Sequence, residues 1–365
     1  MRRKKKKRTL LKRFLRAIGI VCLCVVIALG GMVAFLSVTE YRPADRETLK
    51  VEGASTVKPQ IGVPLSVVSW NIGYGALGDN ADFFMDGGEM VHTADKARIE
   101  QNLDDLIAQA QSLQPDILLL QEVDRNADRS ERIDEFTRFA QSLADYTASF
   151  ANNFKVPFLP YPVPPIGKVD SGLATYSAFR TADATRVQLP VPFSWPMRMA
   201  NLKRCLLVSR MPVAESDREL VVVNLHLEAY DNGEGKIAQT KMLAELLSAE
   251  AKKGNYVIAG GDFNQFFSST NTDAFPTYEG NWQAGAIDET QFDGDWAFLM
   301  DESVPSCRSL YKVYSGADKA SFQYYVIDGF IVSGNISVQD FASQDLGFVS
   351  SDHNPVRMQI TLQKQ

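Results

Sequence analysis

Polar side chains that could bind a metal ion or a phosphate group lie in five segments of the chain, which we interpret as the ends of apolar strands. The segments are residues 66–73, 115–124, 222–227, 258–264 and 350–356. In the same order they supply Asn71, then Glu122, then His226, then Asp262 with Asn264, and finally Asp352 with His353. Because α/β folds bind substrates where strand ends open into loops, we expect these side chains to converge on one pocket.

The chemistry that these residue types favour is that of a hard divalent cation. Carboxylate and amide oxygens suit Mg²⁺, Mn²⁺ or Ca²⁺, whereas zinc prefers imidazole and thiolate ligands. The chain has three histidines, and two of them lie in these segments. Imidazoles beside carboxylate-bound Mg²⁺ fit phosphoryl transfer, because the metal neutralises phosphate charge while histidine moves protons. We therefore predict Mg²⁺ or Mn²⁺ as the cofactor and a phosphate ester as the substrate.

The elements that must position these residues alternate along the chain. Hydrophobic patterning predicts strands over residues 65–70, 116–120, 220–227, 256–259 and 325–332, and helices over residues 94–113, 130–144 and 235–252. Residues 150–200, with eight of the 16 prolines, and residues 263–298 are expected to be rich in loops. The alternation predicts an α/β domain in which helices cover a buried sheet.

The N-terminus reads as a membrane anchor. Residues 1–16 hold ten basic residues and no acid, and the apolar run over residues 17–38 has the ~20 residues that a spanning helix needs. The basic tail should stay cytoplasmic, which predicts a single-pass protein with an extracellular catalytic domain over residues 61–365, joined by a tether over residues 39–60. A cleavable signal peptide is the alternative, although its apolar core is normally shorter, about 7–15 residues.

The net charge of the chain bears on its substrate, and its cysteine content bears on disulfide bonding. Beyond residue 16 the chain has 28 basic and 44 acidic residues, a formal charge of −16. An acidic body repels a polyanion, so nucleic acid is disfavoured as a substrate without being excluded. Cys205 and Cys307 are expected to be free and buried, although a disulfide between them remains an alternative. We expect a monomer.

The ordered set S-W-N, Q-E-V, N-L-H-L, G-D-F-N and S-D-H-x-P resembles the endonuclease/exonuclease/phosphatase family. Each motif alone is weak, but the five occur here in the family's order. The resemblance implies a four-layer α/β/β/α sandwich, with two packed sheets between helical layers. It also implies metal-dependent hydrolysis of phosphoric esters, and residues 171–177 are similar to a strand of the sphingomyelinase-like branch.

Metal ligands follow from the same resemblance. Asn71 and Glu122 would hold the metal, with Glu122 as the principal ligand. Asp262, Asn264 and Asp352 would approach the metal as further oxygen donors.

The resemblance also assigns catalytic roles. Asp262 would orient or deprotonate the attacking water, and Asn264 would touch the phosphate. His226 would bind the phosphate or protonate the leaving group. His353 would contact the scissile phosphate, and Asp328, which stands where the family has an I-D-Y strand, would orient it. The less favoured alternative is that Asp328 merely caps a strand.

Three functions remain open on the sequence. The first is a phosphodiesterase that acts on lipid head groups or small phosphodiesters. The second is a surface endonuclease that degrades DNA, which requires a basic groove beside the site. The third is a catalytically inactive binding protein, against which the retained acidic and histidine residues argue.

Overall fold

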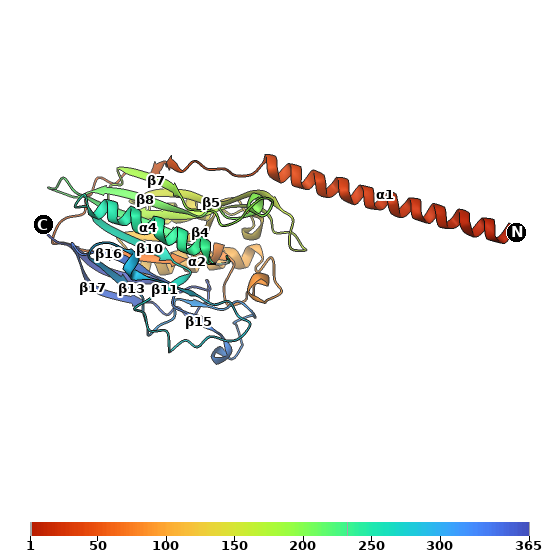
Figure 1. Ribbon diagram of the computed structural model, residues 1–365. Helices are drawn as coiled ribbons and strands as arrows, with labels where there is room; N and C mark the ends of the chain where they lie inside the picture. The colour runs from red at the N-terminus through yellow and green to blue at the C-terminus, as the bar shows by residue number, and fades with distance from the viewer. Residues whose placement is uncertain (1, 232, 365) are drawn as a thin grey trace.

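Two seven-stranded sheets packed face to face form the centre of the computed structural model, which describes residues 2–231 and 233–364 (Figure 1). Sheet A has the order β1 (Arg46–Thr48), β7 (Asp183–Gln188), β8 (Cys205–Pro212), β9 (Glu219–His226), β10 (Tyr256–Asp262), β16 (Asp328–Ser333), β13 (Trp296–Leu299). Sheet B has the order β17 (Ile336–Ser343), β18 (Val356–Leu362), β3 (Pro64–Asn71), β4 (Ile117–Asp124), β6 (Gly167–Ser177), β5 (Thr147–Leu159), β2 (Val51–Glu52).

Helices and small strand pairs complete the fold. The α-helices are α1 (Arg2–Val38), α2 (Lys96–Ser112), α3 (Glu135–Ser142) and α4 (Glu234–Ala251). The short strands β11 (Gln265–Phe267) and β12 (Gly285–Ile287) pair with each other, as do β14 (Cys307–Arg308) and β15 (Tyr324–Tyr325). The short 3₁₀ turns are η1 (Gly73–Gly75), η2 (Phe84–Asp86), η3 (Asp128–Ser130), η4 (Met197–Ala200), η5 (Glu289–Gln291) and η6 (Lys319–Ser321).

Side chains along the central strands point alternately to the two faces of each sheet, and both faces are covered by other layers. In β9, Val222 points between the sheets, where it joins a core with Val67 of β3 and Ile258 of β10. Its neighbours Val221 and Val223 point to the other face of sheet A. Because both faces of these strands are buried, the strands read as continuous apolar runs in the sequence.

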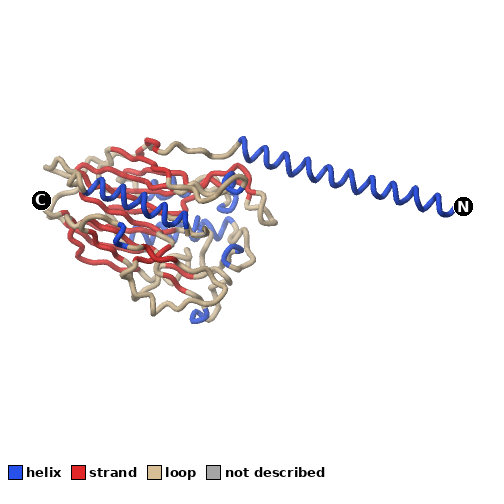
Figure 2. Tube along the Cα trace, viewed as in Figure 1, coloured by secondary structure: helices blue, strands red, loops and turns tan. Residues whose placement is uncertain are grey.

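Helices cover the two outer faces of the sheets (Figure 2). On sheet A, Leu243 and Leu247 of α4 pack on the outward side chains of β9 and β10. On sheet B, Leu103 of α2 and Phe136 of α3 pack on the outward side chains of β3 and β4. The predicted four-layer α/β/β/α sandwich is therefore confirmed.

Two predicted regions differ from the structure. Residues 150–200, expected to be loop-rich, contain most of β5 and all of β6 and β7, because their prolines cluster in the turns between long strands. The expected tether over residues 39–60 also needs correction at residues 46–52, which form edge strands β1 and β2 by pairing with β7 and β5.

Smaller differences concern the ends of elements. Helix α3 begins at Glu135 instead of residue 130, because Asp134 caps it by accepting a hydrogen bond from the Thr137 N–H at 2.9 Å. The strand predicted over residues 325–332 is divided between β15 and β16. Cys205 and Cys307 are free and buried, as expected.

Helix α1 leaves the sandwich near its loops and extends away from it, whereas the C-terminus lies at the opposite end (Figure 1). Within the described residues, α1 is the one helix long and apolar enough to cross a membrane, over Leu10–Val38. Its apolar side chains are largely exposed between residues 10 and 35, which is compatible with a lipid environment.

Gly261 of β10 provides a test of how tightly the sandwich is packed. A Cβ atom there would lie 2.0 Å from the Leu225 carbonyl oxygen, at a φ of 152°. We expect Gly261→Ala to lower the free energy of unfolding by about 3 kcal/mol or more, because the backbones of β9 and β10 must separate. Denaturant unfolding of the detergent-solubilised protein measures this change.

Gly316→Ala is the matched control, since Gly316 also has a positive φ, 72°, but a Cβ atom added there would have no neighbouring atom within 4 Å. Only backbone strain remains at that position, so a loss of about 1 kcal/mol is expected. Equal losses in the two variants would contradict the packing explanation.

Candidate active site

Strand register brings three of the predicted site residues side by side in sheet A. Asp262 is the direct partner of His226 on the parallel strand β9 and of Asp328 on the antiparallel strand β16. His226 Nε2 lies 3.4 Å from Asp262 Oδ2. The three side chains therefore form a row across the ends of three neighbouring strands.

Sheet B delivers Asn71 and Glu122 to the same place. Glu122 has a φ of 54° and lies where a bulge interrupts the pairing of β4 with β6, which redirects its side chain. The Asn71 amide nitrogen lies 3.3 Å from Glu122 Oε1, 3.0 Å from Asp262 Oδ2 and 3.5 Å from His353 Nε2. Asn71 is thus the point at which residues from both sheets meet.

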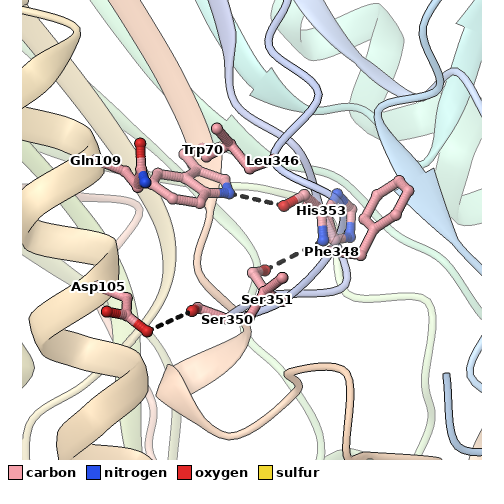
Figure 3. A pocket seen from close by; sticks show the side chains of 9 residues that line it. Trp70, Asp105, Gln109, Leu346, Phe348, Ser350, Ser351 and His353 are labelled. Carbon is pink, nitrogen blue, oxygen red and sulfur yellow. Dashed lines mark hydrogen bonds between the residues drawn. The ribbon is translucent and has the colours of Figure 1, made fainter. Parts of the chain in front are cut away.

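Hydrogen bonds hold the segment before β18 against the end of β3. The Ser351 hydroxyl donates to the Asn71 carbonyl at 2.8 Å, and the His353 N–H donates to Ser351 Oγ at 3.1 Å. The Trp70 indole N–H donates to the His353 carbonyl at 2.8 Å, beside a small cavity of about 260 Å³ (Figure 3). These bonds fix the backbone that carries Asp352 and His353.

The two histidines of the site have opposite electrostatic surroundings. Burial lowers the pKa of His353, but the Asp328 carboxylate, 2.8 Å from its Nδ1, together with Cys307 and Asp352 holds that pKa well above its ordinary value. Burial and then the nearby Arg204 guanidinium hold the pKa of His226 well below its ordinary value. His353 is therefore charged near neutral pH, whereas His226 is neutral.

Several carboxylates are crowded together in this buried place. Burial, followed by the negative charge of Asp328, raises the pKa of Asp262 to about 7. Burial also raises the pKa of Asp352 to about 6, with Glu122 adding to the effect. The Asp352 Oδ1 atom is buried and has no hydrogen-bond partner. A divalent cation fits this set, because it would supply the missing partner and relieve the repulsion.

A cavity of about 620 Å³ opens over these residues. Six of the predicted site residues line it, namely Glu122, His226, Asp262, Asn264, Asp352 and His353. Asn71 and Asp328 support the lining from behind through the contacts given above. Asn264, at a φ of 52°, donates from its amide to the Leu227 carbonyl at 3.0 Å and from its N–H to Asp262 Oδ1 at 2.8 Å. The structure therefore brings all the predicted site residues together.

A family model described as the endonuclease/exonuclease/phosphatase family matches residues 68–353 of the chain. The chain belongs to the endonuclease/exonuclease/phosphatase family. Members of this family are generally phosphoric ester hydrolases that use a divalent metal. No curated protein sequence matches the chain.

Solved structures of the family share this fold at low sequence identity. An endonuclease/exonuclease/phosphatase from Beutenbergia cavernae is 18% identical, with a TM-score of 0.54 over 82% of this chain and 72% of that one. ANGEL2, a 2′,3′-cyclic phosphatase in complex with adenosine-2′,3′-vanadate, is 16% identical, with a TM-score of 0.54 over 87% of this chain and 99% of that one. The human Nocturnin catalytic domain with a bound sulfate anion is 16% identical, with a TM-score of 0.50 over 86% and 97%.

Two buried arginines of the cavity were missed by the sequence reasoning. Arg204 donates to the His226 carbonyl at 3.4 Å and lies 3.8 Å from Glu228, while Arg308 donates to the Gly78 carbonyl at 2.7 Å. Both guanidinium groups line the cavity. Neither lies in a family motif, and their contacts join segments far apart in the chain, so no local pattern marks them.

Asp328→Asn tests the electrostatic pairing of His353. Loss of the carboxylate removes the charge that holds the pKa of His353 up, so His353 should lose its proton at a lower pH than in the wild type. An NMR titration of the ring resonances measures this shift. The pKa of His353 is raised in the folded wild-type protein, so its pairing with Asp328 should stabilise the fold fully below about pH 6.5. This stabilisation, which Asp328→Asn removes, should shrink as the pH rises through the wild-type pKa of His353. An unchanged titration of His353 would contradict the pairing.

Proposed function

We propose that this protein is a membrane-anchored, Mg²⁺-dependent phosphodiesterase that acts on lipid head groups or small phosphodiesters. The observation that carries the proposal is the convergence of five separate motifs on one cavity, with the Asn71 amide in contact with Glu122, Asp262 and His353. An inactive binding protein would have no need to retain buried carboxylates of raised pKa beside a charged histidine.

The cation would be held by the oxygen donors of the site. Glu122 is the principal ligand in this proposal, with Asp262, Asp352, Asn71 and Asn264 as further donors. When bound, the ion neutralises charge on the phosphate group that enters the cavity. Mg²⁺ or Mn²⁺ suits an all-oxygen set of this kind.

The remaining chemistry falls to the side chains themselves. Asp262, whose pKa is raised to about 7 by burial and by Asp328, is suited to accept a proton from the attacking water near neutral pH. His353, charged through its contact with Asp328, donates a hydrogen bond to a phosphate oxygen. His226 is neutral, so it binds the phosphate through a ring N–H, and Asn264 contacts the same group.

The proposed topology follows from the basic residues at the N-terminal end of α1, which precede its apolar segment. The basic residues 1–16 stay in the cytoplasm, residues 17–38 cross the membrane, and the catalytic domain over residues 61–365 lies outside. The acidic body of the protein disfavours DNA. A surface nuclease is nevertheless the second candidate, because Arg129, Arg204 and Arg308 line the cavity and attract any phosphate polyanion.

The proposal predicts hydrolysis that depends on Mg²⁺. Full-length protein in detergent should cleave sphingomyelin or bis(p-nitrophenyl) phosphate with Mg²⁺ and lose that activity in EDTA. His353→Ala and Asp262→Asn should each lower kcat by about 10²–10⁴-fold, because the first removes a charged hydrogen-bond donor to the phosphate and the second removes the group that accepts a proton from water. Initial rates at saturating substrate measure the effect.

The third histidine provides a matched control. His92 is exposed, and its ring nitrogen lies 3.1 Å from the Pro165 carbonyl, outside the row of site residues. His92→Ala should keep wild-type rates. Cleavage of supercoiled DNA without turnover of either small or lipid substrate would favour the nuclease. Activity that survives both site substitutions would show that the site is wrongly assigned.

A further inference from the structure

The carboxyl end of α1 is fixed to the folded domain. The Ser37 hydroxyl donates to the sulfur of Met199 at 2.8 Å, and the Trp195 indole N–H donates to Ser37 Oγ at 3.4 Å. Just beyond the helix, the buried Glu40 carboxylate lies 3.3 Å from Arg198 and 3.4 Å from the Lys203 ammonium group. A membrane crossed by α1 would therefore have a defined position relative to the loop that joins β7 to β8.

The length of the apolar segment sets the depth of that loop. A helix crosses the ~30 Å hydrocarbon layer with about 20 residues. The apolar run that follows the basic tail begins at Ala17, so such a span ends near Leu36. Leu36 is buried against Val156 and Met199 of the domain. The loops that cover Leu36 would therefore lie at the outer surface of the bilayer.

Four large apolar side chains are exposed on these loops, and we call them the apolar rim. Tyr161 and Val163 follow β5 and are 72% and 89% exposed, while Trp195 and Met197 precede β8 and are 57% and 66% exposed. The loops of residues 150–200 reach toward the end of α1 (Figure 1). Gathered apolar groups mark an interaction surface, and tryptophan and tyrosine favour the interface between lipid and water.

The cavity of the candidate active site continues to the same rim. Tyr161 and Met197 belong to the rim and also line the cavity. Phe154, Leu159 and Phe193 extend this apolar wall, and the carboxylates and histidines of the site complete the lining. A wall of this kind would bury an acyl chain while the phosphate group reaches the polar residues.

We propose that the apolar rim lies in the outer interface of the bilayer. The cavity then takes a phosphate ester with an apolar tail directly from that lipid layer, an inference that rests on the proposed hydrolase activity. The anchor serves to hold the rim at this depth. A soluble polyanion would instead have to pass between the rim and the membrane surface.

Tryptophan quenching tests the position of the rim. The chain has four tryptophans, at positions 70, 195, 282 and 296, and none lies in α1. Full-length protein in vesicles of phosphatidylcholine with brominated acyl chains should show quenched emission, and Trp195→Phe should remove most of that quenching. Trp296→Phe, on β13, is the control and should retain it. Quenching that is absent in the wild type, or equal in the two variants, would overturn the membrane position.

Turnover of two substrates tests the source of the ester. The double variant Val163→Ser/Trp195→Ser changes rim residues that do not line the cavity. Its kcat/KM for sphingomyelin in vesicles should fall about tenfold or more, because apolar contact with the bilayer is lost. Its kcat/KM for bis(p-nitrophenyl) phosphate in solution should stay within about twofold.

The outcomes separate this inference from the proposed function. A wild-type protein that turns over the soluble ester but not the vesicle lipid would overturn the lipid substrate and leave the hydrolase standing. Equal losses of kcat/KM on both substrates in the double variant, with an unchanged thermal transition, would also overturn the uptake of a lipid substrate from the bilayer. A wild-type protein inactive on both would overturn the hydrolase, and the quenching result would still decide where the rim lies.

Discussion

The register between β9, β10 and β16 is the constraint on which the rest of the site depends. It places His226, Asp262 and Asp328 opposite one another at the ends of three strands. Because successive side chains on a strand point to opposite faces, a slip of one residue would turn any of them away from the cavity. The packed cores above and below sheet A hold this register, and the close approach of Gly261 to the Leu225 carbonyl leaves no room for a side chain in between.

This geometry concentrates negative charge in a buried place, and the fold compensates for it locally. Asp328 is paired with His353, and the Asn71 amide contacts both Glu122 and Asp262. Despite these contacts, burial raises the pKa of Asp262 to about 7 and the pKa of Asp352 to about 6. Carboxylates in that condition are poised to exchange protons for a cation, so the electrostatic stress of the site and its proposed metal chemistry have the same origin.

The sequence allowed the core of the fold, and the convergence of the candidate site residues on one place, to be predicted, because both depend on local patterns. Buried strands are apolar runs, and the candidate site residues stand in short motifs next to them, although Asp328 begins β16 and Asp352 and His353 precede β18. Three features depend on contacts between distant segments and could not be predicted: the strands hidden among the prolines of residues 150–200, the arginines Arg204 and Arg308, and the ion pairs of Glu40 that fix α1 to the domain.

Calorimetric titration of Mn²⁺ into the full-length protein in detergent tests the central claim most directly, because it measures the cation site without assuming a substrate. At pH 6.5 we expect one Mn²⁺ to bind with release of protons, since Asp262 and Asp352 are partly protonated at that pH. Glu122→Gln should abolish binding, and Glu131→Gln, which changes a carboxylate in the turn before α3, should not. Absence of Mn²⁺ binding, or binding that Glu122→Gln leaves intact, would contradict a metal-dependent hydrolase built on these residues.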